Sequence, residues 1–223
     1  MIESLYFQYG DFFHKYIKDI MRKLSKITES IWSDMQDRSA GDVVRKEDQW
    51  KIDLIKEFIE RHHLEEKDYH INSDYSLDIH RNIMIKHFDI LDVREGKLPF
   101  KFGRVDGTMW LNSLDLKTLE NCPKEVTGDF VIYENKLENF IGGPENVGGD
   151  FAANMNLSLK SLDGSPKKVG GKYSILACMS IKDISGISPE IGGNLEIPKK
   201  TKFEFSDDDF RQYSNIKGEI KRL

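Results

Sequence analysis

The chain has 223 residues, of which 39% are hydrophobic and 32% are charged, and its formal net charge is -5. This length suffices for one large domain or two small ones with a buried core. The negative charge excludes a global basic field that would attract nucleic acid or an anionic membrane. No run approaches the ~18 apolar residues of a membrane helix, and the N-terminus lacks a signal-peptide pattern. Cys122 and Cys178 form neither a disulfide framework nor a metal-ligand spacing. We therefore expect a soluble cytoplasmic protein without a cofactor or a bound metal.

The first third of the chain has the apolar spacing of helices. Between Phe13 and Ile31, apolar residues recur at three- and four-residue steps, and basic residues fill the other face of this predicted helix. After a break at 37–42, a second helix is predicted from about 47 to 65. Residues 1–66 are therefore predicted to be a helical region. The first helix carries more aromatic residues than one stripe needs, Tyr6 and Phe7 among them. We expect these aromatics to dock on the following domain, or else to contact a partner or a second copy of the chain.

An internal repeat follows. From about residue 70, apolar and polar residues alternate as in short strands. Triplets of the form Val-x-Gly or Ile-Gly-Gly then open five copies, each continuing with alternating apolar residues. The triplets begin at Val105, Val126, Val147, Val169 and Ile191. The steps between these positions are 21, 21, 22 and 22 residues. Such a period predicts a solenoid, in which each coil buries its apolar side only by stacking on its neighbours.

The repeated glycine is expected to have a structural role. It shares the inward parity of the Val, Phe and Ile positions, where a side chain would crowd a neighbouring chain. The stretch GGPENVGGDF at 142–151 could be mistaken for a phosphate-binding loop. However, its glycine pair precedes a strand, recurs in every coil and lacks the Lys-Ser/Thr of such loops. The stretch is therefore interpreted as the turn and strand entry of one coil.

Both ends of the predicted solenoid, which spans 67–205, are atypical. An earlier, degenerate coil is predicted around Ile79, Ile83 and Ile85, with Arg81 at the glycine position. At the other end, Ser206 followed by three acids has the pattern of a helix N-cap, so 206–223 is predicted to be a C-terminal cap with a short helix. The expected fold class is α+β: an N-terminal helical region, a short leucine-rich-repeat-like β-solenoid of about 21–22 residues per coil, and a helical cap.

The repeat phrase resembles a known family. LPFKFGRVDG at 98–107, LENCPKEVTGDF at 119–130 and LDGSPKKVGGKY at 162–173 resemble leucine-rich-repeat-like proteins of large tailed bacteriophages. The lead-in YHINSDYSLDI at 69–79 and the tail FEFSDDDFRQYSNIKGEI at 203–220 do so too. The resemblance covers roughly 50–220 and leaves the first helix unmatched. It implies a solenoid architecture and a phage origin; because the family's members are mostly of unassigned function, it implies no chemistry.

The outward positions of the predicted strands are the main candidate site. If Val, Gly, Phe and Ile point inward, their neighbours point outward and align in columns across stacked coils. An exposed aromatic pair beside two acids is typical of a protein-binding patch. Alternatively, this face packs against the N-terminal helices or is solvated. The candidate partner-binding residues are Trp110, Asp129, Val131, Tyr133 and Asp150, together with Tyr6 and Phe7 of the first helix.

Three functional hypotheses follow. The first is a non-enzymatic protein that binds, and by analogy inhibits, a host or defence protein, with a homo-oligomer through the first helix as a further option. The second is a metal-dependent or acid–base enzyme with a site near 62–90, where histidines such as His80 and His87 occur among aspartates. The third is a nucleic-acid binder that uses the basic face of the first helix. Cys178 follows an apolar run and is interpreted as buried and inert.

Overall fold

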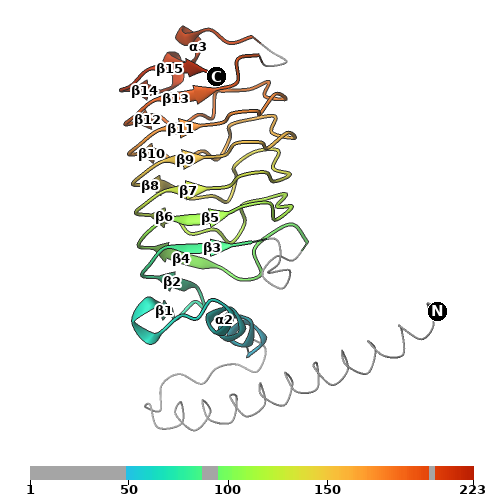
Figure 1. The fold of residues 1–223 in the computed structure, drawn as a ribbon, viewed down its shortest axis with the longest axis vertical. Coiled ribbons are helices and arrows are strands. Elements are labelled where there is room, and N and C mark those ends of the chain that lie inside the picture. The colour runs from blue at the N-terminus through green and yellow to red at the C-terminus, as the bar shows by residue number, and fades with distance from the viewer. Residues whose placement is uncertain (1–48, 87–94, 201–203) are drawn as a thin grey trace, which may run out of the picture. The chain divides into compact units, whose positions relative to one another are not determined.

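The computed structural model describes residues 49–86, 95–200 and 204–223, which belong to one compact unit, Gln49–Leu223. This unit is a β-solenoid built from two sheets, whose strands stack in coil order in Figure 1. Each coil contributes one strand to each sheet. The predicted solenoid is therefore confirmed, whereas Tyr6, Phe7 and the rest of the first predicted helix lie outside the described residues.

The first sheet has eight strands in the order β1-β2-β4-β6-β8-β10-β12-β14. Their bounds are β1 Tyr69–Ile71, β2 Leu77–Ile79, β4 Phe102–Val105, β6 Glu125–Val126, β8 Asn146–Val147, β10 Lys168–Val169, β12 Glu190–Ile191 and β14 Asn215–Ile216. The second sheet has seven strands: β3 Ile83–Ile85, β5 Met109–Leu111, β7 Phe130–Val131, β9 Phe151–Ala152, β11 Tyr173–Ser174, β13 Leu195–Ile197 and β15 Ile220–Arg222. All neighbouring strands are parallel except β1 and β2, which form an antiparallel hairpin.

The strand register reproduces the sequence period. Val126 pairs with Val147, and Val147 pairs with Val169, so each repeat unit is one coil. The side chains at these positions are almost fully buried, as are those of the Phe130, Phe151 and Tyr173 column of the second sheet. The rings of Phe151 and Tyr173 are 4.8 Å apart between centroids. Stacking therefore makes one continuous apolar core, as expected for coils that cannot bury their apolar side alone.

The glycine corner differs from the prediction in one respect. The sequence suggested a single strand running through the repeated glycine, with the glycine facing inward. Instead the chain bends there and divides each coil's extended segment into two short strands. A Cβ atom on Gly149 would meet Gly128 C at 2.9 Å and one on Gly170 would meet Gly148 O at 2.0 Å, so the close approach is to the preceding coil rather than to the core. The expected close approach of neighbouring chain is thus present, but along the stacking direction.

Backbone hydrogen bonds join these corners from coil to coil. Gly149 N donates to Gly128 O at 2.9 Å, Gly171 N donates to Gly149 O at 2.8 Å, and Gly193 N donates to Gly171 O at 2.7 Å. These are ordinary backbone hydrogen-bond lengths. What requires glycine is the direction of the missing side chain, because a Cβ atom on Gly149 or Gly171 would lie 2.9 or 3.0 Å from the carbonyl carbon of the preceding corner glycine.

Buried polar side chains form a second coil-to-coil ladder after the second sheet. Asn135 Nδ2 donates to Leu111 O at 2.8 Å, Asn156 Nδ2 donates to Ile132 O at 2.9 Å, and Cys178 Sγ donates to Ala153 O at 3.2 Å. These three residues occupy the same position in successive coils, because each follows by four residues a member of the Val131–Ala152–Ser174 register column. The structure therefore gives Cys178 a ladder position in addition to the burial predicted for it.

Two turns complete each coil. The first places an ordinary residue in the left-handed conformation: Ser113, Glu134, Met155 and Ala177, with φ between 55° and 60°. The second is a turn in which a side-chain oxygen accepts from the backbone N–H two residues later, as in Asx and Ser/Thr turns. The accepting side chains are Thr118, Asn139, Ser161 and Asp183.

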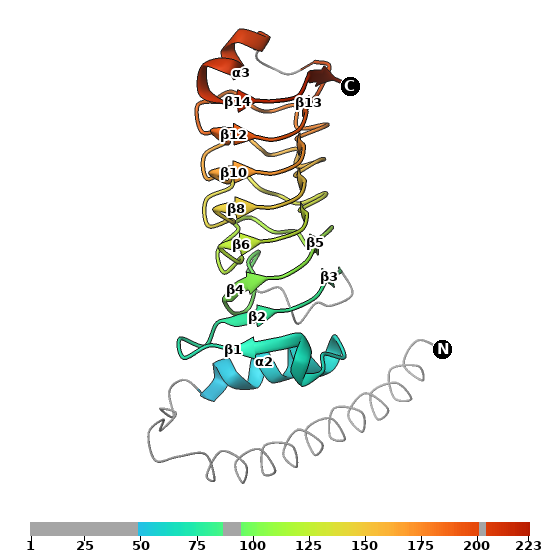
Figure 2. The same cartoon turned by 90° about the vertical axis from the view of Figure 1, so that its left-hand side faces the viewer.

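Two different caps cover the ends of the solenoid (Figure 2). At the first end, β1 pairs with β2, and helix α2 (Gln49–Arg61) packs Phe58 edge-on against Phe100 and Phe102. The 3-10 turn η2 (Glu66–Asp68) joins α2 to β1. At the other end, helix α3 (Asp207–Tyr213) begins at Ser206, whose side chain accepts from the backbone N–H of Asp209. The predicted second helix and the short helix at Ser206 are both confirmed. The predicted boundary at 205 is wrong, because β14 and β15 pair in parallel with β12 and β13 and extend the solenoid to Arg222. The repeat was missed there because α3 lies between β13 and these strands and lengthens the step to Ile216.

Replacing Gly170 by alanine should destabilise the solenoid, because its Cβ atom would lie 2.0 Å from Gly148 O. We expect a loss of about 2 kcal/mol or more of unfolding free energy, measured by urea denaturation. Thr127 occupies the equivalent position one coil before Gly148 and already carries a side chain, so Thr127→Ala is the matched control and should change stability by less than about 0.5 kcal/mol. Equal effects of the two substitutions would contradict the close approach of Gly170 to Gly148 O of the preceding coil.

Candidate functional site

The outward face of the second sheet carries an apolar column over its first four strands. Strand register aligns Met84 with Trp110, Trp110 with Val131, and Val131 with Ala152. We call these four residues the outward column. The next residues in register are polar or charged, namely Ser174, Glu196 and Lys221. The outward column therefore ends halfway along the solenoid.

Tyr133 lies beside this column and is 37% exposed. Trp110 and Val131 are partly exposed, as the alternation of the sequence predicts. Ser174 is different: it was expected to face outward, but it is buried and donates its hydroxyl to Asn154 Oδ1 at 2.9 Å. The structure thus brings Trp110, Val131 and Tyr133 together on one face.

Asp129 and Asp150 have a structural task at the edge of this face. Asp129 Oδ1 accepts from Asp150 N at 2.7 Å, and Asp150 Oδ1 accepts from Lys172 N at 2.8 Å. Asn82 and Thr108 make the same bond in earlier coils, accepting from the backbone N–H of the residue one coil later. These side-chain acceptors form a further ladder, one residue after the glycine ladder in each coil, since Asp129 and Asp150 directly follow Gly128 and Gly149. The two carboxylates are therefore already engaged with backbone, although each keeps a second oxygen.

A group of exposed apolar side chains that sequence reasoning missed lies in the turns after the second sheet. Leu157 is 62% exposed and Met179 is 51% exposed. They occupy equivalent positions in adjacent coils: Ala152 pairs with Ser174, and Leu157 and Met179 each come five residues after one of these two. Met155 precedes Leu157 by two residues, and its sulfur accepts a hydrogen bond from the Tyr133 hydroxyl. We call Met155, Leu157 and Met179 the turn ridge; it is linked to the outward face through Tyr133.

The turn ridge coincides with the extra residue of the longer coils. In the coil of β6 and β7, one residue, Lys136, separates the inward Asn135 from the inward Leu137. In the coil of β8 and β9, two residues separate Asn156 from Leu159, whose N–H donates to Asn156 O at 3.0 Å across the turn. The change of step from 21 to 22 residues in the sequence was the signal that could have located this turn.

In the region proposed for an enzyme site, His80 and His62 contact different kinds of neighbour. His80 Nδ1 lies 3.1 Å from Asp106 Oδ2, and the Arg104 hydrogen bond, followed by that of His80, lowers the pKa of Asp106. The His62 ring lies against the Phe58 ring, with 4.2 Å between centroids and the planes tilted by 39°. Within residues 49–86, 95–200 and 204–223, no group of three or more His, Cys, Asp or Glu side chains could hold a metal ion. His87 lies outside the described residues.

Both cysteines are buried free thiols. Burial raises the pKa of the Cys178 thiol to about 12, and it raises the pKa of Cys122 as well. Neither residue is therefore a ready nucleophile at neutral pH.

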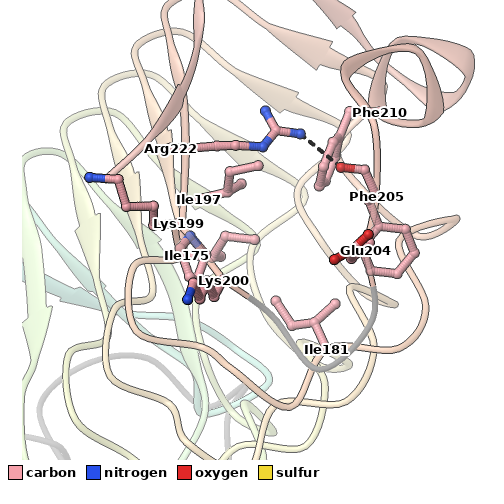
Figure 3. A pocket seen from close by; sticks show the side chains of 10 residues that line it. Ile175, Ile181, Ile197, Lys199, Lys200, Glu204, Phe205, Phe210 and Arg222 are labelled. Carbon is pink, nitrogen blue, oxygen red and sulfur yellow. Dashed lines mark hydrogen bonds between the residues drawn. The ribbon is translucent and has the colours of Figure 1, made fainter.

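A cavity of about 480 Å³ lies beside the last coils (Figure 3). Ile175, Ile181 and Ile197 are part of its apolar lining. Lys199 and Lys200 are at its exposed side, and Glu204 contributes a carboxylate. Arg222 also lines the cavity, but its guanidinium donates to Asp207 and to Phe205 O. The cavity therefore combines aliphatic side chains with two lysines.

Comparison of the chain with protein-family models, curated proteins and solved structures finds no match. Among the helices that the structure describes, none is long and apolar enough to cross a membrane. The fold and its surfaces are consequently the basis for any functional proposal.

The ladder role of Asp150 can be separated from a binding role by two substitutions. Asp150→Asn keeps a side-chain oxygen that can accept from Lys172 N, as Asn194 does for Glu219 N in a later coil. It should therefore leave the unfolding free energy nearly unchanged. Asp150→Ala removes the acceptor and should cost about 1 kcal/mol in urea denaturation. If Asp150→Asn is as destabilising as Asp150→Ala, the bond to Lys172 N is not what Asp150 contributes.

Proposed function

We propose that this protein is a non-enzymatic binding protein that recognises another protein through the outward face of its second sheet. The observation that carries the proposal is the apolar outward column beside the exposed Tyr133. A stacked solenoid holds such a face rigid, so little conformational entropy is lost when a partner binds. Trp and Tyr are also the side chains most often found at the energetic centre of protein interfaces.

The partner that we propose is a host or defence protein of a bacterial cell in which a phage encodes this chain. The support for this origin is the resemblance of the repeat phrase to phage leucine-rich-repeat-like proteins. Inhibition of the partner is the corresponding role, and a bacterial cytoplasm is the corresponding location. An enzyme near 62–90 and a nucleic-acid binder remain the alternatives, and no observation in the described residues favours either.

A pull-down from bacterial lysate with the full chain tests the proposal. Trp110→Ser combined with Tyr133→Ser removes the two aromatic side chains of the face without adding charge. We expect this variant to lose at least about tenfold of the specifically captured partner, quantified by mass spectrometry, because anchors of this kind are typically worth more than 1 kcal/mol.

The matched control is Tyr213→Ser, which removes a 43% exposed aromatic side chain from α3. It should capture the same partner as the wild type. Circular dichroism and urea denaturation of each variant establish that the fold is retained. Undiminished capture by the folded Trp110→Ser/Tyr133→Ser variant would rule out this face as the binding site.

A further inference from the structure

Two of the three turn-ridge residues, Leu157 and Met179, are mostly exposed to solvent. In the two coils before it, the equivalent turns carry Asp115 and Lys136, which form an ion pair with 3.0 Å between Lys136 Nζ and Asp115 Oδ1. Exposed turns favour polar residues and glycine, because these side chains support the turn and remain hydrated. Leu157 and Met179 are apolar instead, and more than half of the surface of each residue is exposed to solvent. Because the two residues are equivalent in adjacent coils, their backbones lie about one strand spacing, ~4.8 Å, apart. Their side chains therefore form one exposed apolar patch.

Basic residues continue this surface toward the last coil. Strand register aligns Ala152, Ser174 and Glu196, so the positions three residues later, Met155, Ala177 and Lys199, also form one column. Lys199 and the adjacent Lys200 are exposed. Lys182 is three residues beyond Met179 and is also exposed. Ile181, the neighbour of Lys182, lines the same cavity as Lys199 and Lys200. Three exposed lysines therefore follow the ridge toward the last coil, although the net charge of the chain is -5.

These three lysines have no acidic partner within 4.0 Å among the described residues, and this sets them apart from their neighbours. Lys160 occupies the position of Lys182 one coil earlier and pairs with Glu138 Oε1 at 2.6 Å. Lys172 lies within 4.0 Å of both Asp150 and Glu196. The carboxylate in the lining of the adjacent cavity is Glu204. An acidic binding partner would supply the missing counter-charges.

We propose that the turn ridge and Lys182, Lys199 and Lys200 form one docking surface for an acidic protein segment with large apolar side chains. The apolar side chains of that segment contact Met155, Leu157 and Met179, and its carboxylates face the lysines. Methionine is suited to such a contact because its flexible thioether adapts to different apolar shapes. The inference rests on the proposed protein-binding function and adds the charge and the apolar character of the partner.

The experiment measures fluorescence polarisation of labelled peptides with the full-length protein. The first peptide alternates four glutamates with three leucines. The second has lysine in place of each glutamate, and the third has serine in place of each leucine. We expect saturable binding of the first peptide, at least about tenfold tighter than that of either other peptide and weakened by salt. Absence of saturable binding, or equal binding of the first two peptides, would overturn the proposal.

Variants locate the site. Leu157→Ser/Met179→Ser should weaken binding of the acidic peptide by about tenfold, and Lys199→Glu/Lys200→Glu should do the same and reduce its salt dependence. Ile141→Ser is the apolar control, because Ile141 is 58% exposed on a different turn. Lys124→Glu/Lys217→Glu is the charge control, since it changes the net charge by the same amount. If the controls weaken binding as much as the ridge and lysine variants, the assigned surface is wrong.

Two further outcomes separate the possible occupants. Light scattering after size exclusion reports a second copy: a dimer that Leu157→Ser/Met179→Ser converts to a monomer would assign the ridge to self-association and overturn the proposal. The lysate pull-down distinguishes this inference from the proposed function. If the aromatic variant of the outward face loses its partner while the acidic peptide fails to bind, the proposed function stands and the acidic docking surface is wrong.

Discussion

The fold depends on direct backbone contact between consecutive coils at the glycine corner. There the N–H of each corner glycine donates to the carbonyl of the corner glycine one coil earlier, from Gly107 through Gly128 and Gly149 onward. The contact leaves no room for a Cβ atom, and the two flanking strands can pair in register only if it forms. Bending at this corner is also what turns a single extended segment into two sheets. The contact therefore fixes the register of consecutive coils and the positions of both faces, while the turns absorb the differences in coil length.

The ladders of side chains extend this contact into the rest of the coil. Asp129 and Asp150 act on one side of the corner, while Asn135, Asn156 and Cys178 act after the second sheet. Each satisfies backbone groups that the short strands leave without a partner. Positions outside these ladders are free to vary, and the outward column and the turn ridge occupy such positions. Function is thus expected where the stacking makes no demand on the side chain.

Much of the fold could be predicted from the sequence because stacking requires a repeating pattern. The 21- and 22-residue steps, the inward Val and Phe positions and the helix cap at Ser206 all correspond to features of the structure. The bend was missed because alternation of apolar residues continues across it, so a period of two cannot distinguish one strand from two. The ladder role of Cys178 was missed because the residue was considered alone; alignment with Asn135 and Asn156 would have shown it.

The candidate site was predictable only in part, for a related reason. Alternation placed Trp110, Val131 and Tyr133 on one face, but it could not show that Asp129 and Asp150 each use one carboxylate oxygen to accept from backbone. The turn ridge was not predicted because turns have no apolar period, and its signal was a single extra residue per coil.

Hydrogen–deuterium exchange of the full chain tests the central claim, backbone contact between coils at the glycine corner, most directly. The account predicts that the amides of Gly149 and Gly171, at a partly exposed corner, exchange as slowly as those of β7 and β9. Exchange within seconds, as in an open surface loop, would contradict it.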